Sequence, residues 1–152
     1  MRSQLESEVL DSEIIKLLEK DVVSKTDIDS KDFFSNLFTK RKKDSSFRMI
    51  LNLKFLNIEC NTNHFKMESI KHAINMISPG DYLASIDIKD AFYTIPIHPD
   101  YKHFLKFMWR GIPYQFEAMP NGYLDVMRVF TKILKPPFSA LREKRFLLSS
   151  LC

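Results

Sequence analysis

An alternating apolar segment that ends in a carboxylate, residues 82–88, constrains the fold of this chain more than any other feature. Apolar side chains occupy one parity from Tyr82 to Ile88, and Asp87 occupies the other, as in a β-strand with two unlike faces. A carboxylate at the end of an apolar strand is costly to bury unless it is paired or binds a metal. Asp87 is therefore a candidate metal ligand, with a helix N-cap or a surface ion pair as the alternative. Asp90 is expected to cap the short turn that follows it.

Periodicity elsewhere in the sequence predicts a mixture of helices and strands. Apolar residues recur at helical spacing behind a Ser3-x-x-Glu6 capping box, which predicts a helix over about residues 4–20. Strict alternation predicts a strand from Phe47 to Leu53 that forms a hairpin with the basic segment before it, across a turn at 44–46. The other predicted elements are a loop at 24–32, a loop at 57–65, a helix at 67–77 that ends at Pro79-Gly80, a hairpin of strands 104–109 and 114–119 around Arg110-Gly111, and a helix over 126–134 that ends at Pro136-Pro137. This order of elements predicts an α+β domain.

Charge changes sign along the chain. Residues 1–30 carry 4 basic and 8 acidic side chains, residues 31–66 carry 8 and 3, residues 67–100 carry 2 and 5, and residues 101–152 carry 9 and 3. Two basic segments therefore flank an acidic one, which suits a polyanion held around a site that needs carboxylates. An unevenly charged, solvated surface is the alternative.

Several classes of protein are excluded by what the sequence lacks. It contains neither Gly-x-Gly-x-x-Gly nor a Walker-type phosphate loop, which excludes glycine-rich nucleotide cradles. The histidines are not spaced for zinc, and Cys60 and Cys152 form no Cys-x-x-Cys pair, which argues against a disulfide framework or a structural zinc site. No apolar stretch is long enough to span a bilayer, and the first residues do not resemble a signal peptide. We therefore expect an intracellular protein of the cytoplasm or nucleus.

Several segments in a fixed order resemble retrotransposon reverse transcriptases, which are RNA-directed DNA polymerases. Asp87-Ile-Lys-Asp-Ala-Phe-Tyr resembles the first catalytic motif of these enzymes, and residues 42–57 resemble their fingers motif. Residues 64–70 are similar to the segment between these motifs, and residues 114–132 to the approach to the next palm motif. The similarity is to the DIRS-like and gypsy-like kind and covers about residues 9–148.

The resemblance implies a fold and a division of the chain. The fold would be an incomplete right-hand polymerase, with the fingers and the first part of the palm built from antiparallel hairpins and packed helices. Residues 1–30 would form an N-terminal helix and loop, residues 31–148 a partial reverse transcriptase domain, and residues 149–152 a truncated tail. The implied partners are an RNA or DNA template-primer and deoxynucleoside triphosphates, with no membrane.

The resemblance also implies roles for individual residues in template-directed nucleotidyl transfer. Asp87, with the Ile88 backbone carbonyl, would bind the two Mg²⁺ ions of the reaction. Phe92 would be the bulky gate that excludes ribonucleotides, because a ring leaves no room for an extra hydroxyl. Arg48 would bind the incoming triphosphate through paired hydrogen bonds. The other implied ligands are Lys42 or Lys43, Asn121 and Gly122 for the nucleotide, and Lys40, Arg41 and Lys54 for the nucleic-acid backbone.

The sequence departs from the family pattern in two places. Residues 123–127 are bulkier than the small residues and proline expected after Gly122, and overpacking there would cost about 1–3 kcal/mol or displace the template strand. The Tyr-x-Asp-Asp hairpin that supplies the remaining metal carboxylate should begin shortly after Leu148, and the sequence does not contain it. We therefore expect no polymerase activity from these 152 residues alone. The alternatives are a non-catalytic nucleic-acid-binding remnant that uses the basic residues, and an unstable product of a degraded element.

Overall fold

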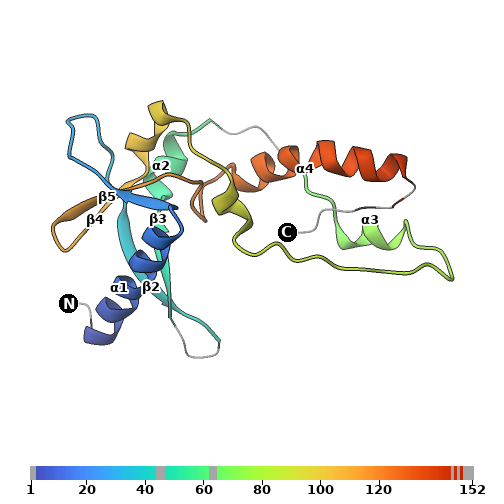
Figure 1. Cartoon of the computed structure of the whole chain (residues 1–152), viewed down its shortest axis with the longest axis horizontal. Helices are drawn as coiled ribbons and strands as arrows, with labels where there is room; N and C mark the ends of the chain where they lie inside the picture. Colours follow the sequence, from blue (N-terminus) through green and yellow to red (C-terminus); the bar gives the residue numbers. More distant parts are fainter. Residues whose placement is uncertain (1–2, 44–46, 62–64, 145, 147, 149–152) are drawn as a thin grey trace.

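The computed structural model describes residues 3–43, 47–61, 65–144, 146 and 148. They form a packed body and an elongated arm (Figure 1). The body comprises the described residues of 3–61 and 91–130, and the arm comprises those of 65–90 and 131–148. The arm extends from one side of the body, so that its two chain segments run away from the packed strands and back.

The first helix, α1 (Gln4–Glu19), packs one face into the body. Ser3 and Glu6 form the predicted capping box: the Glu6 amide donates to Ser3 Oγ at 3.2 Å, and the Ser3 amide donates to Glu6 Oε2 at 2.8 Å. The buried side chains of the helix are Leu10, Ile14 and Leu17. The structure confirms the helix predicted at 4–20.

In the described part of the chain, the larger sheet has three antiparallel strands in the order β1-β5-β4. These strands are β1 (Val23–Lys25), β4 (Lys106–Trp109) and β5 (Ile112–Phe116). Arg110 and Gly111 join β4 to β5 with φ angles of 48° and 76°, the positive values that a two-residue hairpin of matching twist requires. The predicted second hairpin is confirmed, with shorter strands. Part of the loop predicted at 24–32 is strand β1 instead, because its backbone pairs with β5.

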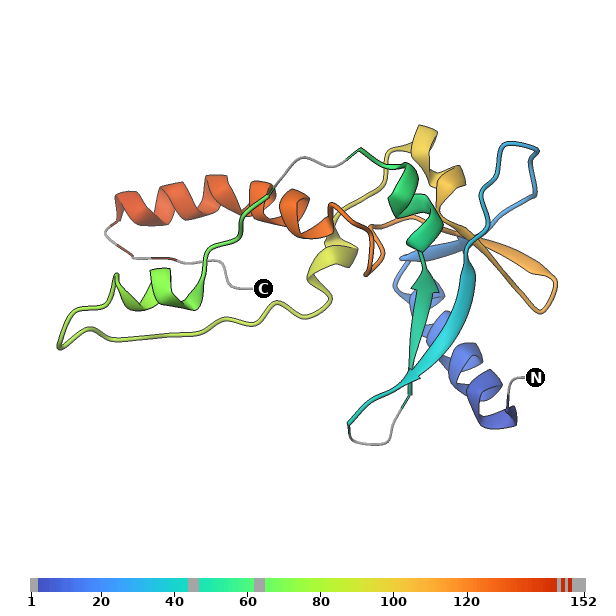
Figure 2. The ribbon, with the colours of Figure 1, turned by 180° about the vertical axis from the view of Figure 1, so that it is seen from behind.

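The other pair of strands forms a basic hairpin. β2 (Asn36–Arg41) and β3 (Phe47–Asn52) are antiparallel, which confirms the strand predicted at 47–53. Leu37 and Leu51 lie opposite each other and are buried. Seen from behind, this hairpin runs alongside α1, while the β4-β5 hairpin projects from the body separately (Figure 2). The predicted turn at 44–46 lies outside the described residues.

Three short helices complete the body. α2 (Lys54–Glu59) occupies the start of the loop predicted at 57–65, so that prediction was wrong in part. Its formation follows from burial of Leu53 and Leu56, three residues apart on one face. The two 3₁₀ helices are η1 (Ala91–Thr94) and η2 (Pro99–Phe104), the second with proline at its start, where no amide donor is needed.

The strand predicted at 82–88 lies in the arm, and this prediction was wrong. Residues 82–88, all of them described, are exposed and extended and belong to no strand. A strand needs a neighbour to satisfy its backbone groups, and none of the described residues pairs with this segment. α3 (Ile70–Ile74) is also shorter than the helix predicted at 67–77. The apolar pattern is real in both segments, but it faces solvent in the described structure.

The last helix, α4 (Val126–Glu143), continues through Pro136-Pro137, where the sequence predicted its end. Proline has a helical φ, so its cost is the missing amide donor and the clash with the preceding turn. Both prolines are exposed, and water can satisfy the carbonyls that lose a partner. The predicted tail at 149–152 lies outside the described residues.

The hydrophobic core lies between α1, the strands and α2. Its most completely buried large side chains are Phe107, Phe116 and Leu10. Core residues come both from the first 30 positions, such as Leu17 and Val23, and from the strands beyond them. The structure confirms the α+β class with antiparallel sheets. No helix among the described residues has the length and apolar character required to cross a bilayer.

Candidate functional site

A polar cavity of about 220 Å³ brings together two of the predicted nucleotide ligands, Arg48 and Asn121. Its walls come from segments that are distant in the sequence: α1, β3, η1 and the turn before α4. The lining residues are Glu13, Lys16, Leu17, Lys20, Arg48, Met49, Asp90, Tyr93 and Asn121. The cavity therefore combines two carboxylates, three cations, a phenol and an amide around a small apolar floor, which suits a charged or hydrogen-bonding ligand.

Tyr93 is a residue of this cavity that sequence analysis missed. Burial is the main cause that raises the pKa of its phenol, and the nearby Asp90 carboxylate adds to it. Hydrogen bonding from the Asn121 side chain opposes the rise in the pKa. The phenol is thus held neutral beside the amide that was predicted to contact the nucleotide. Its position within the Asp87-to-Tyr93 motif was the only signal for it in the sequence.

The η1 turn is tied to α1 by an ion pair. Lys20 Nζ lies 2.6 Å from Asp90 Oδ2, and the two side chains are 48% and 39% exposed. Asp90 precedes η1 in a left-handed conformation, with φ of 55°. Asp90 occupies the N-cap position of η1, as predicted, but its side chain makes no capping hydrogen bond, so that part of the prediction was wrong. On the other side of the turn, the Phe92 ring meets Phe130 edge to face, 5.4 Å between centroids.

Asp87 and Ile88 lie in the exposed segment of the arm. They are not among the residues that line the polar cavity, although Asp90 is only three residues further on. Two Mg²⁺ ions would need more than one carboxylate to hold them against their mutual repulsion. Among the described residues, no three aspartate, glutamate, histidine or cysteine side chains gather as metal ligands. The described residues therefore do not fit a two-metal site, and the magnesium assignment stays a prediction.

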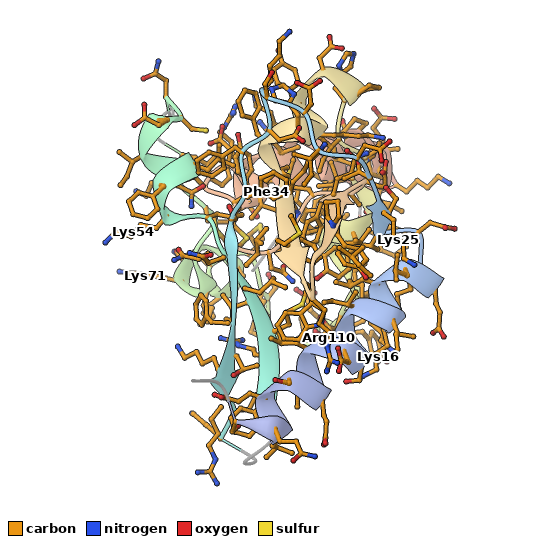
Figure 3. All side chains as sticks on the ribbon, turned by 90° about the vertical axis from the view of Figure 1, so that its left-hand side faces the viewer. Lys16, Lys25, Phe34, Lys54, Lys71 and Arg110 are labelled. Atoms are coloured by element: carbon orange, nitrogen blue, oxygen red, sulfur yellow. The ribbon has the colours of Figure 1, made fainter. Side chains whose placement is uncertain are left out.

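The remaining predicted cations are exposed on the β2-β3 hairpin, on the residues that follow β2 and on α2. Lys40 lies directly opposite Arg48 in the β2-β3 register, so two like charges share one face of the hairpin. Such a pair repels itself unless an anion lies between or beside it. Lys54 of α2 projects into solvent on the same side of the molecule as Lys71 of α3 (Figure 3). The other exposed basic residues of this region are Arg41, Lys42 and Lys43.

The Asn121-Gly122 turn is fastened to α2. Asn57 Nδ2 donates to the Gly122 carbonyl at 2.9 Å, and the Leu124 amide donates to Asn57 Oδ1 at 3.1 Å. Gly122 has φ of 93°, which favours glycine at this position. The bulky residues that follow are accommodated in the turn before α4: the Tyr123 hydroxyl donates to Cys60 Sγ at 3.9 Å, and Asp125 pairs with Arg128 at 2.5 Å.

A second, larger cavity of about 500 Å³ is lined by residues of α2 and η2 and by Tyr123. Its walls are mainly apolar, with Tyr101, Phe104 and Met119 among them. None of the sequence-predicted site residues lines it. We therefore place the candidate chemistry in the smaller polar cavity.

Comparison with the sequences of known proteins shows similarity to retroviral polyproteins. The chain matches no protein-family model. It is 24% identical over 112 residues to the Gag-Pol polyprotein of Walleye dermal sarcoma virus, covering 73% of this chain and 6% of that protein. It is 22% identical over 123 residues to the Pol polyprotein of Equine infectious anemia virus (strain Wyoming), covering 76% and 11%. It is 26% identical over 90 residues to the Pro-Pol polyprotein of Simian foamy virus type 1, covering 59% and 8%.

Solved structures give the same picture at the level of the fold. The native protease-reverse transcriptase of Prototype Foamy Virus superposes with a TM-score of 0.72 at 19% identity, covering 89% of this chain and 18% of that one. The foamy viral protease-reverse transcriptase in complex with dsDNA gives 0.69 at 18% identity, covering 89% and 28%. The chain is thus similar to a region of retroviral Pol polyproteins and has the fold of part of a protease-reverse transcriptase. It spans a small share of the length of each.

Proposed function

We propose that this chain is the fingers and the first part of the palm of a retrotransposon RNA-directed DNA polymerase, and that its polar cavity binds the incoming deoxynucleoside triphosphate. The observation that carries the proposal is the convergence of Arg48 and Asn121 on one cavity from distant parts of the sequence. The similarity to retroviral Pol regions supports the same reading.

The chemistry of the cavity suits a triphosphate and its sugar. The Arg48 guanidinium can donate two parallel hydrogen bonds to phosphate oxygens, and Lys42 or Lys43 can add a further cation from the hairpin. Asn121 presents an amide, which can donate and accept at the sugar. Phe92 is not among the residues that line the cavity; its ring packs on Phe130 in the turn that borders the cavity, and a ring fixed there is our candidate for excluding a 2′-hydroxyl.

Catalysis in such enzymes needs bound Mg²⁺, which neutralises the phosphates and activates the primer hydroxyl. Asp87 and the Ile88 carbonyl are our candidate ligands, but the described residues supply no cluster of carboxylates beside them. We therefore propose nucleotide binding without catalysis for the 152-residue chain. Primer extension with Mg²⁺ and all four deoxynucleotides tests the proposed lack of catalysis. Template-dependent incorporation by the purified chain would contradict it.

Nucleotide binding is tested directly by titrating the purified chain with deoxyadenosine triphosphate and Mg²⁺ in a calorimeter. We expect saturable binding that Arg48→Ala weakens about 10- to 100-fold, the loss typical of a charged hydrogen-bonding group. Lys25→Ala is the matched control, because Lys25 is an exposed cation of β1 that does not line the cavity. Absence of saturable binding, or equal losses in both variants, would count against the proposal.

A second function is favoured by the basic hairpin. The like-charged Lys40–Arg48 pair and the neighbouring Arg41, Lys42 and Lys43 are suited to a nucleic-acid backbone. A related foamy viral protein has been solved in complex with dsDNA, which supports the same partner class. A steep fall of affinity for a template-primer duplex with rising salt, reduced by Lys42→Ala, is expected. A flat salt response would exclude this function.

A further inference from the structure

The Lys20–Asp90 ion pair joins the C-terminal end of α1 to the residue at which the arm meets the η1 turn. Lys20 follows the last turn of α1, which is anchored in the core through Leu17. Asp90 ends the exposed segment of the arm and begins the η1 turn. Both charged groups line the polar cavity, so the pair forms part of its wall.

The turn that follows Asp90 has little support from the side where the chain enters it. Residues 81–90 are all exposed. On the exit side, by contrast, the turn is held by the body, because the Met119 amide donates to the Ile95 carbonyl at 2.9 Å and Phe92 packs on Phe130. The Lys20 ammonium, 2.6 Å from Asp90, is therefore the contact that fixes the entry side.

The geometry of Asp90 shows that its carboxylate is directed to Lys20 rather than to its own turn. Its backbone is left-handed, a conformation that aspartate tolerates better than most residues. Its backbone carbonyl accepts from the Tyr93 amide at 2.9 Å, while its side chain does not cap the helix. The orientation of η1, with Phe92 and Tyr93 on it, is thus set jointly by the backbone turn and by α1.

We propose that Lys20 is a positioning residue of the nucleotide site: by holding Asp90, it fixes the turn that presents Tyr93 to the cavity and carries Phe92 at its border. This inference rests on the proposed nucleotide-binding function. Lys16, one helical turn earlier on the same wall, does not share the role, because it pairs with Glu13 within α1. Lys20 acts through the turn and needs no contact with the nucleotide.

The pair is too exposed to matter much for global stability, so its effect is local. Exposed ion pairs contribute little to the free energy of unfolding. The same small energy matters more for the local opening of a short turn, which does not require the rest of the body to unfold. Replacing Lys20 should therefore loosen η1 and leave the melting temperature of the body almost unchanged.

The experiment compares Lys20→Met, Lys20→Arg and a matched control in the full chain. Arg110→Met is the control, because Arg110 Nη2 also lies 2.6 Å from a carboxylate, that of Asp11 in α1, and the pair is remote from η1 in the sequence. Amide hydrogen exchange at Tyr93 and Ile95 is the first measurement. Lys20→Met should speed exchange at both amides about fivefold, whereas Lys20→Arg and Arg110→Met should leave it unchanged.

Affinity for deoxyadenosine triphosphate is the second measurement. Lys20→Met should weaken the affinity about threefold to tenfold, and Lys20→Arg should keep the affinity of the parent chain. Unchanged exchange in Lys20→Met, faster exchange without weaker binding, or an equal effect of Arg110→Met would overturn the inference. If the parent chain binds no nucleotide, the proposed function fails. Hydrogen exchange then still reports separately whether Lys20 holds the turn.

Discussion

The body and the arm carry the same kind of apolar pattern, but only the body packs it. In β3, alternation places Leu51 in the core, opposite Leu37 of the neighbouring strand. In the arm, the alternation at 82–88 leaves Leu83 and Ile86 71% and 88% exposed. The difference is the presence of a hydrogen-bonded neighbour. An alternating pattern gives a strand only where another strand satisfies its backbone and another layer covers its apolar face.

The same division separates the two halves of the proposed site. Arg48 and Asn121 belong to the body, whose framework fixes them at the cavity. Asp87 belongs to the arm, where no described strand or helix covers it. The turn at Asp90 lies at the border, tied to the body by Lys20. Ligand binding and metal binding should therefore respond differently to changes in the two regions.

The largest expected contrast comes from truncating one large apolar side chain in each region. Phe107 in β4 is completely buried, so Phe107→Ala should lower the free energy of unfolding by about 3–5 kcal/mol. Ile86→Ala should change it by less than about 0.5 kcal/mol, because the side chain is already in solvent. Urea denaturation followed by circular dichroism measures both. A large loss in Ile86→Ala would show that the arm is packed in solution.

A slightly smaller effect is expected from a buried ion pair of the body. Lys106 Nζ lies 2.8 Å from Asp32 Oδ2, and the two side chains are only 6% and 1% exposed. Lys106→Met would leave the Asp32 carboxylate buried without its cation, at a cost of about 3 kcal/mol. The exposed pair between Lys16 and Glu13 is the control, and Lys16→Met should have almost no effect on unfolding.

The Asp32 pair also predicts a pH dependence. Burial acts to raise the pKa of Asp32, but the Asp29 amide and the Lys106 ammonium outweigh it, so the pKa lies below its ordinary value of 3.8. A carboxyl group with a depressed folded pKa stabilises the fold above the unfolded pKa, and this contribution is lost as pH falls through the folded value. The parent chain should therefore lose stability below about pH 4, and Lys106→Met should lose less over that range. Parallel curves for the two proteins would contradict this assignment.

The sequence predicted those elements whose partners are close along the chain. The capping box of α1 and both hairpins are of this kind, because their contacts join neighbouring segments. It failed where the outcome depends on distant packing. The strand expected at 82–88 lacks a described neighbour, and α4 continues past Pro136 because both prolines are exposed and water can satisfy the carbonyls that lose a partner.

The candidate site shows the same limit. Arg48 and Asn121 were found through a motif resemblance, and the structure adds that they share a cavity. Tyr93 was missed because a tyrosine next to a phenylalanine is indistinguishable in sequence from a core residue. The Lys20–Asp90 pair could not be predicted, since nothing local links two charges 70 residues apart. Such contacts follow only from how the folded chain brings the end of α1 next to the start of η1.

The smallest expected effect concerns one hydroxyl group in each region. Tyr93→Phe removes the partner of the Asn121 side chain and should weaken binding of deoxyadenosine triphosphate by about threefold to tenfold, the cost of one hydrogen bond. Tyr82→Phe removes a hydroxyl from a fully exposed side chain of the arm and should change nothing. Because burial and Asp90 raise the pKa of Tyr93, its neutral form stabilises the fold below pH 10, and this contribution is lost as pH rises through the folded pKa. Thermal unfolding above pH 10 should therefore be less pH-dependent in Tyr93→Phe than in Tyr82→Phe. Equal pH dependence in the two variants would mean that Tyr93 is as exposed as Tyr82, and the border between body and arm would then have to be moved beyond η1.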